Sequence, residues 1–246
     1  MKSSGEGLKS LSRDSVGLDP VVFLGADTTK PAVRQGYGVS GTGKTELMKE
    51  LIRRGEKSPE FDEYFRIIIF DVKHDGYQSL LPEKSEPITD FMGYEKSLNE
   101  NRVTLIHPEI SEAQDFLDEI IDHLFRTSER IEGFSATLIV EESSTYITAH
   151  KVPDSLKRFA TQGRSMGLSL ILLNQRAMNN RWVDSQTASM FLFRLARPDA
   201  TLLKTRWGIN PDELESRLSE KRFSFAHFDL ESLKLEFYEP IKLRDE

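Results

Sequence analysis

The chain of 246 residues contains no cysteine, which excludes a disulfide framework and any metal site built on thiolates. Histidine is scarce as well: the five stand at positions 74, 107, 123, 150 and 227 and lack the spacing of zinc ligands. We find no internal repeat. The composition is compatible with a reducing cytosol.

Long apolar runs are also missing. The longest, residues 168–173, is far shorter than the roughly 20 apolar residues that a membrane-spanning helix needs. The first residues lead into Ser-, Gly- and Lys-rich sequence without the apolar segment of a signal peptide. We therefore expect no transmembrane segment, a flexible N-terminal tail over residues 1–20, and a single domain over residues 21–246 that can bury a large core.

The sequence has no excess of positive charge. Its 33 Lys and Arg residues face 40 Asp and Glu residues, which gives a net charge of −7. Proteins that grip nucleic acid usually present a basic face, so this balance argues against tight DNA binding by an isolated monomer. It does not exclude a ring that concentrates a few cations in a pore. Basic clusters at residues 176–181, 204–206 and 221–222 are candidates, although such runs are more often solvated surface.

Residues 36–45 contain the complete pattern of a phosphate-binding loop: Gly38, four residues, and then Gly43-Lys44-Thr45. The glycines let backbone N–H groups approach phosphates, and a helix N-terminus favours negative charge. We expect Lys44 to reach the β- and γ-phosphates and Thr45 to offer its hydroxyl to Mg²⁺, with ATP and Mg²⁺ as the cofactors. The expected nucleotide-binding residues are Gly38, Ser40, Gly41, Thr42, Gly43, Lys44 and Thr45. A glycine-rich linker is the alternative, and the features that follow disfavour it.

A second half of such a site lies downstream. Residues 136–140 are an apolar run that ends at Glu141 and Glu142. One carboxylate can sit behind the waters of a Mg²⁺ ion, while the other orients or deprotonates an attacking water. Alone, this pattern could equally be a strand that ends in solvated acids, but after a phosphate-binding loop it favours a site. Another apolar run, residues 168–173, is followed by the polar group Asn174-Gln175-Arg176.

Apolar and β-branched runs predict strands, and amphipathic periodicity predicts helices. The expected strands are residues 32–37, 65–70, 103–106, 136–140, 168–173 and 191–195, a short preliminary strand at 20–25, and a hairpin of 223–228 with 233–238. The expected helices are residues 44–54, 111–126 opened by a capping box at Ser111, 152–166, 198–207, and a short helix from Pro211. This order predicts an α/β fold: a mostly parallel, doubly wound sheet of the P-loop NTPase type with a RecA-like core and an antiparallel C-terminal edge hairpin.

Three classes of P-loop protein fit these elements. A guanine-nucleotide switch needs a base-reading Asn-Lys-x-Asp, which is absent from the sequence. A nucleotide kinase would use an arginine-rich lid and an acceptor pocket but would gain little from paired strand-end glutamates. A motor ATPase uses these features: Glu142 on the water, Gln175 reading the γ-phosphate, and an arginine from a neighbouring subunit completing the charge clamp.

The motor reading coincides with a family resemblance. Asp71-Val72-Lys73 with Tyr77, residues 138–142 (LIVEE), and residues 162–176, which contain QGRSMG and LILLNQR, resemble the FtsK/HerA superfamily of ring-forming DNA-pumping ATPases. The resemblance runs from about residue 36 to residue 238 and covers only the motor core of that superfamily. In size the chain is similar to the genome-packaging ATPases of tailless icosahedral viruses with an internal membrane, and to small ATPases of mobile elements.

The resemblance implies a role for each site residue. Glu141 stands where the superfamily usually has the Walker B aspartate, so its carboxylate is one methylene longer. With Thr45 it would hold Mg²⁺, and the contact of Glu141 would be made through water. The catalytic residues implied are Lys44, Glu142 as the base, Gln175 as the γ-phosphate sensor, and Arg164 as the arginine that acts on a neighbouring subunit, with Arg176 as the second choice.

These implications lead to one expected function and three alternatives. The expected function is an ATP-driven translocase of double-stranded DNA, a homo-oligomeric ring and most simply a hexamer, that packages a viral genome. A capsid vertex or a membrane protein would be a further partner, and the location would be the host cytoplasm or a packaging vertex of the virion. The alternatives are a DNA pump of a plasmid or conjugative element, a monomeric small-molecule phosphotransferase, and an assembly scaffold with vestigial hydrolysis.

Overall fold

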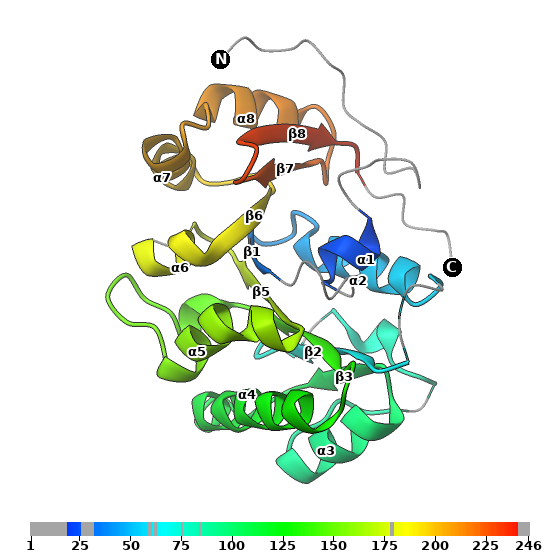
Figure 1. Ribbon diagram of the computed structural model, residues 1–246. Helices are drawn as coiled ribbons and strands as arrows, with labels where there is room; N and C mark the ends of the chain where they lie inside the picture. The colour runs from blue at the N-terminus through cyan, green and yellow to red at the C-terminus, as the bar shows by residue number, and fades with distance from the viewer. Residues whose placement is uncertain are drawn as a thin grey trace.

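The computed structural model describes residues 19–25, 32–58, 61, 63–74, 76–83, 85–177 and 180–240. These residues form one eight-stranded sheet in the order β3-β2-β4-β5-β1-β6-β7-β8 (Figure 1). The strands are β1 (Val33–Tyr37), β2 (Phe65–Phe70), β3 (Val103–Ile106), β4 (Ser135–Val140), β5 (Leu168–Asn174), β6 (Thr187–Leu192), β7 (Phe225–Asp229) and β8 (Lys234–Tyr238).

The first six strands run parallel and the last two run antiparallel. Every neighbouring pair from β3 to β6 is parallel, whereas β6 pairs with β7, and β7 with β8, in antiparallel register. Strands β2, β4 and β5 are mostly apolar because helices cover both faces of the sheet, whereas β1 carries Arg34 and Gln35. The structure thus confirms the predicted α/β fold, including the antiparallel hairpin at its C-terminal edge.

Helices connect the parallel strands. They are α1 (Pro20–Phe23), α2 (Lys44–Gly55), α3 (Phe91–Glu100), α4 (Ala113–Arg130), α5 (Asp154–Gln162), α6 (Arg181–Gln186), α7 (Arg197–Trp207) and α8 (Pro211–Ser219), with short 3₁₀ helices η1 (Gln78–Leu80), η2 (Ser143–Thr145) and η3 (Gly163–Met166). None of the helices in the described part of the chain is long and apolar enough to span a bilayer.

The core has two layers, one on each face of the sheet. Neighbouring residues of a strand point to opposite faces, so Ile68 of β2 packs into the layer under α4 and α5, whereas Ile67 packs into the layer under α2. Leu138 and Ile139 of β4 divide in the same way. With a helical layer on each face, the two ends of the sheet remain as the places where loops gather, and a ligand site is expected at the carboxyl ends of the strands.

Two local predictions are wrong. The expected strand at residues 20–25 begins instead as helix α1, because Pro20 suits the first position of a helix and the Asp19 carboxylate accepts a hydrogen bond from the Val21 N–H at 2.9 Å. The expected capping box at Ser111 does not form either: α4 begins at Ala113 after Glu112, and no side chain caps it.

Helices α3 and α6 and the 3₁₀ turn η3 were not predicted. Both α3 and α6 begin at a polar cap that the sequence pattern did not reveal: the Asp90 carboxylate accepts from the Gly93 N–H, and the Asn180 side chain accepts from the N–H groups of Trp182 and Val183. The expected helix 152–166 is shorter, since α5 ends at Gln162 and η3 follows it. Residues 1–18, which make up most of the expected tail, lie outside the described residues.

His227 in β7 makes the stability of the fold depend on pH. The pKa of His227 is lowered to about 4, chiefly by burial and also by the charge of Arg34, although the charges of Asp229 and Glu236 act to raise it. An unfolded histidine titrates near pH 6.5, so the unfolded chain takes up the proton first as the pH falls, and stability declines from about pH 6.5 down to about pH 4.

We therefore expect His227 alone to reduce the free energy of unfolding by about 2 kcal/mol at pH 5 relative to pH 7. Urea unfolding of the wild type and of His227→Asn at the two pH values measures this difference, because asparagine does not titrate. Carboxylates that do not interact with His227 contribute equally to both proteins and cancel. An equal loss of stability in the two proteins would contradict the assignment.

Candidate nucleotide-binding and hydrolysis site

The phosphate-binding loop connects β1 to α2 and is anchored by the strands on both sides of β1. The N–H of Gly38 donates to the Asn174 carbonyl of β5 at 3.2 Å, and the N–H of Val39 donates to the Arg194 carbonyl beyond β6 at 3.0 Å. A Cβ at Gly38 would lie 2.5 Å from the Cβ of Phe193, and Gly43 has a φ of 104°. Only glycine fits either position without displacing the loop.

The loop ends in a helix N-terminus that can receive an anion. Gly43 is the N-cap of α2 and provides no side-chain acceptor, so the first N–H groups of the helix are open to a ligand. The Lys44 ammonium folds back over the loop and donates to the carbonyls of Gly38 at 2.5 Å and Val39 at 3.3 Å. Burial lowers the pKa of Lys44, while the charge of Glu141 opposes the shift. The Lys44 ammonium thus lies inside the loop, at the place where it would contact the phosphates of a bound nucleotide.

Glu141 meets the loop from the end of β4. Its carboxylate is 4% exposed, lies 3.4 Å from the Thr45 hydroxyl and accepts a hydrogen bond from the Tyr77 hydroxyl at 2.5 Å. Burial raises the pKa of Glu141, whereas the Tyr77 hydrogen bond and the charges of Lys73 and Lys44 lower it. A hydroxyl and a carboxylate at this separation form the oxygen donor set that suits Mg²⁺, so these residues fit the ion. The added methylene of glutamate relative to aspartate does not prevent the approach to Thr45.

Glu142 is held in an unusual backbone conformation. Its φ of 48° and ψ of 47° lie in the left-handed region, which is uncommon for a residue with a Cβ. One carboxylate oxygen pairs with the Lys73 ammonium, and the other accepts from the Ser144 hydroxyl at 2.9 Å. Burial raises the pKa of Glu142, but the hydrogen bonds from Lys73 and Ser144 outweigh it, and the pKa lies below its ordinary value. Glu142 is therefore an anion with two polar partners.

The end of β5 lies between the phosphate-binding loop and the acids, because β5 separates β1 from β4. Asn174 is 1% exposed; its amide nitrogen donates to the Ser143 hydroxyl at 2.8 Å, and its oxygen accepts from the Ser144 N–H at 2.6 Å. The backbone of Gln175 donates a hydrogen bond to Glu142. Asn174 thus fixes the turn that carries Glu142, and Gln175 stands beside it.

The sequence predicted some of the residues of this site but not all of their contacts. Sequence reasoning named Lys44, Thr45, Glu141, Glu142 and Gln175, and the structure brings all five to one end of the sheet. Roles for three further residues were missed: Lys73 and Tyr77 beyond β2, and Asn174 as the anchor of the Glu142 turn. The signals for them were that polar residues follow buried strands and that these residues belong to the segments that carry the family resemblance, and neither signal identifies the partner.

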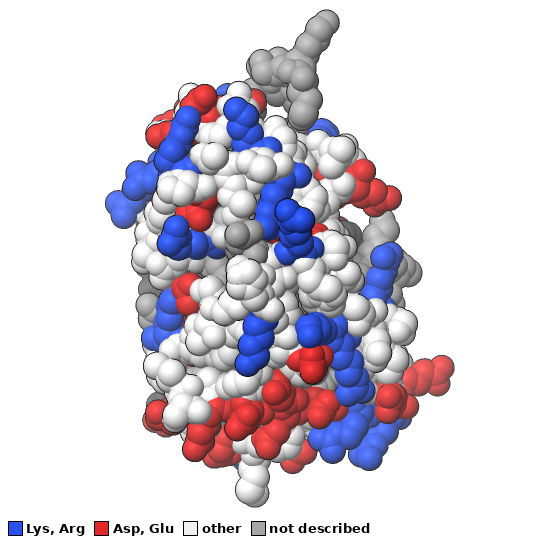
Figure 2. All heavy atoms as spheres, turned by 90° about the vertical axis from the view of Figure 1, so that its left-hand side faces the viewer, with Lys and Arg blue, Asp and Glu red and all other residues white. Residues whose placement is uncertain are grey.

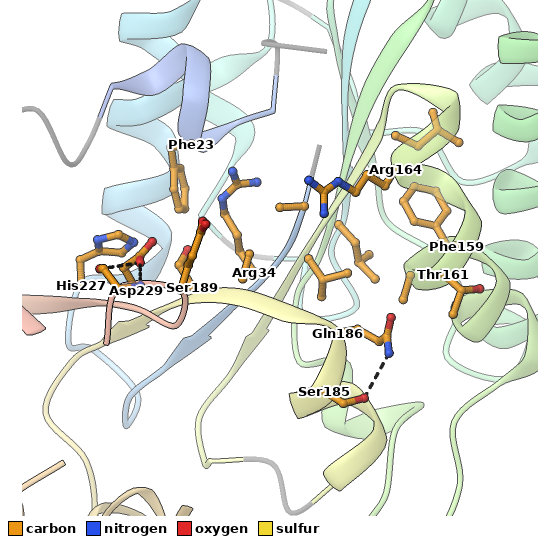
Figure 3. A pocket seen from close by; sticks show the side chains of 18 of the residues that line it. Phe23, Arg34, Phe159, Thr161, Arg164, Ser185, Gln186, Ser189, His227 and Asp229 are labelled. Atoms are coloured by element: carbon orange, nitrogen blue, oxygen red, sulfur yellow. Dashed lines mark hydrogen bonds between the residues drawn. The ribbon is translucent and has the colours of Figure 1, made fainter. Parts of the chain in front are cut away.

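Arg164 does not join this cluster. It belongs to η3, before β5, and lines a hollow of about 910 Å³ together with Arg34 and His227 (Figure 3). The seven residues of β5 separate it from the loop side by roughly 20 Å. Arg164 could therefore act on a nucleotide only from another subunit. Arg176, the second choice, lies on the loop side, and its Nε is 3.7 Å from the Asp199 carboxylate.

No protein-family model and no curated protein sequence matches the chain. Solved structures do. The DNA-packaging ATPase B204 from Sulfolobus turreted icosahedral virus is 15% identical, with a TM-score of 0.64 over 86% of this chain and 98% of that one. The genome packaging NTPase B204 from Sulfolobus turreted icosahedral virus 2, in complex with AMPPCP, is 18% identical, with a TM-score of 0.66 over 87% of this chain and 99% of that one.

A third similar structure is much longer. The cytoplasmic domain of the type VII secretion ATPase EccC from Thermomonospora curvata is 16% identical, with a TM-score of 0.58 over 89% of this chain but 26% of that one. Each of these proteins is named as an ATPase or NTPase, and at these identities the likeness establishes the fold. The chain therefore shares the fold of these ATPases and NTPases.

Proposed function

We propose that the chain is an ATP-hydrolysing motor that moves double-stranded DNA and packages a viral genome. The observation that carries this proposal is the meeting of Lys44, Thr45, Glu141 and Glu142 at the carboxyl ends of β1 and β4. The B204 proteins support the assignment to genome packaging, because the match to this chain covers almost their whole length. They are described as packaging ATPases or NTPases, and one is in complex with ATP-γS.

The site residues divide the chemistry among them. Lys44 would exchange the loop carbonyls for phosphate oxygens, and Thr45 and Glu141 would hold Mg²⁺. Bound Mg²⁺ would neutralise phosphate charge as it develops. Glu142, once its carboxylate is available, orients the attacking water and accepts its proton.

Two more residues complete the proposed reaction. Gln175, beside Glu142, contacts the terminal phosphate and reports its presence to β5. Arg164 of a neighbouring subunit supplies positive charge to the transferred phosphoryl group, since within its own chain it lies at the opposite end of the sheet. A homo-oligomeric ring, most simply a hexamer, gives that geometry. Such a ring would work in the host cytoplasm or at a packaging vertex of the virion, against a capsid or membrane protein.

A basic surface supports DNA as the substrate. Residues 176–206 contain six Lys or Arg and two Asp or Glu, against a net charge of −7 for the chain. Both acids, Asp184 and Asp199, are buried, so the described surface of this segment presents cations without exposed carboxylates. The side chains of Arg181 and Lys204 are exposed and make no hydrogen bond or ion pair with any residue that the structure describes.

Acidic and basic side chains are unevenly distributed on this side of the molecule. Figure 2 shows the side on which α6 and α7 lie: Lys and Arg predominate over its upper and middle parts, with a few Asp and Glu among them, while a band of Asp and Glu crosses its lower part beside a further group of Lys and Arg at the lower right. Helix α4, low in Figure 1, carries the exposed acids Asp115, Glu119 and Asp122. A phosphate backbone would be attracted to the predominantly basic upper part and repelled by the acidic band.

The experiment that tests the proposal is an ATPase assay with and without linear duplex DNA, run beside light scattering for the number of subunits. We expect DNA to stimulate hydrolysis and the active species to be a ring. An ATPase that ignores DNA would count against the motor. Transfer of the γ-phosphate of ATP to an added nucleoside by a monomer would favour a phosphotransferase instead.

The basic surface predicts a specific salt dependence. Replacing Arg181 and Lys204 together by glutamine should reduce the slope of log Kobs for DNA against log salt concentration by about 2, uniformly across DNA sequences. Fluorescence anisotropy of a labelled duplex at several salt concentrations measures the slope. The matched control replaces Lys57 and Lys96, which are exposed cations outside this surface, by glutamine. Equal slopes for the two double variants would exclude the surface as the DNA contact.

A further inference from the structure

A segment beyond β2 reaches into the nucleotide site and has no role in the reaction described so far. In residues 71–74, the buried Asp71 accepts a hydrogen bond from the Lys73 N–H at 2.9 Å. His74 has a φ of 58°, stacks on His107 with ring centroids 4.6 Å apart, and lies 3.0 Å from the Pro108 carbonyl. These contacts fix the turn to the end of β3. The backbone of Lys73 is therefore set while its long side chain can move.

The same segment touches the metal-binding side of the site. A Cβ on Gly76 would lie 2.8 Å from a methyl carbon of Thr45, so the chain passes directly over the first turn of α2. Tyr77, fully buried, donates its hydroxyl to Glu141. The segment is thus part of the wall of the site, and the Lys73 side chain starts from within that wall.

The Lys73 ammonium pairs with the acid that the reaction needs. It contacts one oxygen of Glu142, and Ser144 occupies the other. A carboxylate with both oxygens engaged is a poor acceptor for a proton from water. Lys73 also acts on the rest of the site, since its charge lowers the pKa of Lys44 and of Glu141. The ammonium therefore stands within electrostatic reach of the lysine that meets the phosphates.

We propose that Lys73 is a switch: in the nucleotide-free protein it holds Glu142 inactive, and when a triphosphate binds, its ammonium moves to the terminal phosphate and releases the Glu142 carboxylate for the water. The exchange is favourable because a terminal phosphate offers more negative charge and more acceptor oxygens than a carboxylate does. A diphosphate lacks that group and leaves the pair intact. The Glu142 carboxylate is thereby available to water only while a triphosphate occupies the site. The proposal rests on ATP binding at this site and is independent of DNA.

The test is a cycle of binding measurements on the full chain by calorimetry, with Mg²⁺ and either AMPPCP or ADP. In Glu142→Gln the lysine has no carboxylate to leave, so AMPPCP should bind about 10-fold more tightly than to the wild type, a change of about 1.4 kcal/mol, with ADP affinity unchanged. In Lys73→Met AMPPCP should bind about 10-fold more weakly, again with ADP affinity unchanged.

The double variant separates the switch from simple repulsion between Glu142 and the phosphate. If Lys73 is the switch, the gain from Glu142→Gln falls below about 3-fold once Lys73 is methionine; if repulsion alone acts, the gain is at least as large as before. Retained ADP binding shows that the Lys73→Met site is folded, and Lys73→Arg should bind AMPPCP within about 3-fold of the wild type.

The outcomes also separate this proposal from the proposed function. A wild type that binds neither nucleotide overturns the nucleotide site and the switch together. Binding of both nucleotides with an equal gain from Glu142→Gln in the presence and absence of Lys73 overturns the switch alone. Parallel losses of ADP and AMPPCP affinity in Lys73→Met would likewise make Lys73 a structural residue.

Discussion

Replacing Glu142 by glutamine should lower kcat for ATP hydrolysis by about 1,000-fold while the protein still binds ATP. Glutamine keeps the size of the side chain and a carbonyl oxygen, but it cannot accept the proton of the attacking water. The φ of 48° and the contacts of the turn with Asn174 are set by the backbone and should persist. Steady-state hydrolysis and equilibrium binding of ATP, measured on the same preparation, give the two quantities.

Glu112→Gln is the matched control, because Glu112 is exposed at the start of α4 and makes the same change of charge outside the site. We expect its kcat to equal that of the wild type. A Glu142→Gln protein that hydrolyses ATP within 10-fold of the wild-type rate would remove Glu142 from the role of general base. Normal ring assembly and full biological activity of that variant would instead favour the assembly scaffold.

Replacing Lys44 by methionine should weaken ATP binding by about 100-fold, since a charge-assisted hydrogen bond to phosphate contributes roughly 1.5–3 kcal/mol. Lys44 is 7% exposed and its ammonium already lies against the loop carbonyls, so little reorganisation precedes its contact with phosphate. Methionine fills the space of the aliphatic stem without the charge. Titration with a fluorescent ATP analogue measures the affinity, and far-ultraviolet circular dichroism monitors the fold.

Lys49→Met provides the comparison for Lys44. Lys49 lies in the same helix, and its ammonium pairs with Glu46 at 2.6 Å, away from the loop. This variant should bind ATP as the wild type does. If both lysine variants lose affinity to the same extent, the effect comes from the stability of α2, and the assignment of Lys44 to the phosphates fails.

Much of the fold could be predicted because its information is local. The apolar runs at residues 65–70 and 136–140 match β2 and β4, and the turn between β7 and β8 falls at residues 230–233, within one residue of the expected 229–232. The failures are at helices whose ends depend on a cap or whose apolar pattern is short, among them α1, α3 and α6. Helix α1 has four residues, too few for a periodic pattern, and it exists because Val21 and Phe23 pack into the core beside α2.

The candidate site divides in the same way. The phosphate-binding loop is a contiguous pattern, so Gly38, Gly43, Lys44 and Thr45 could be read directly. The pairing of Lys73 with Glu142 joins residues far apart in the chain, and it depends on β2 and β4 being neighbours in the sheet. Spacing in the sequence cannot express such a contact.

The sequence by itself determined the class of fold, the phosphate-binding loop and the pair of strand-end glutamates, because backbone freedom, helix dipoles and the burial of apolar runs act over a few neighbouring residues. Only the tertiary structure decided which partner each charged side chain has. It placed Lys73 on Glu142 and Tyr77 on Glu141, and it put Arg164 at the far end of β5. The order of strands in the sheet sets these distances, and that order follows from the packing of the whole chain.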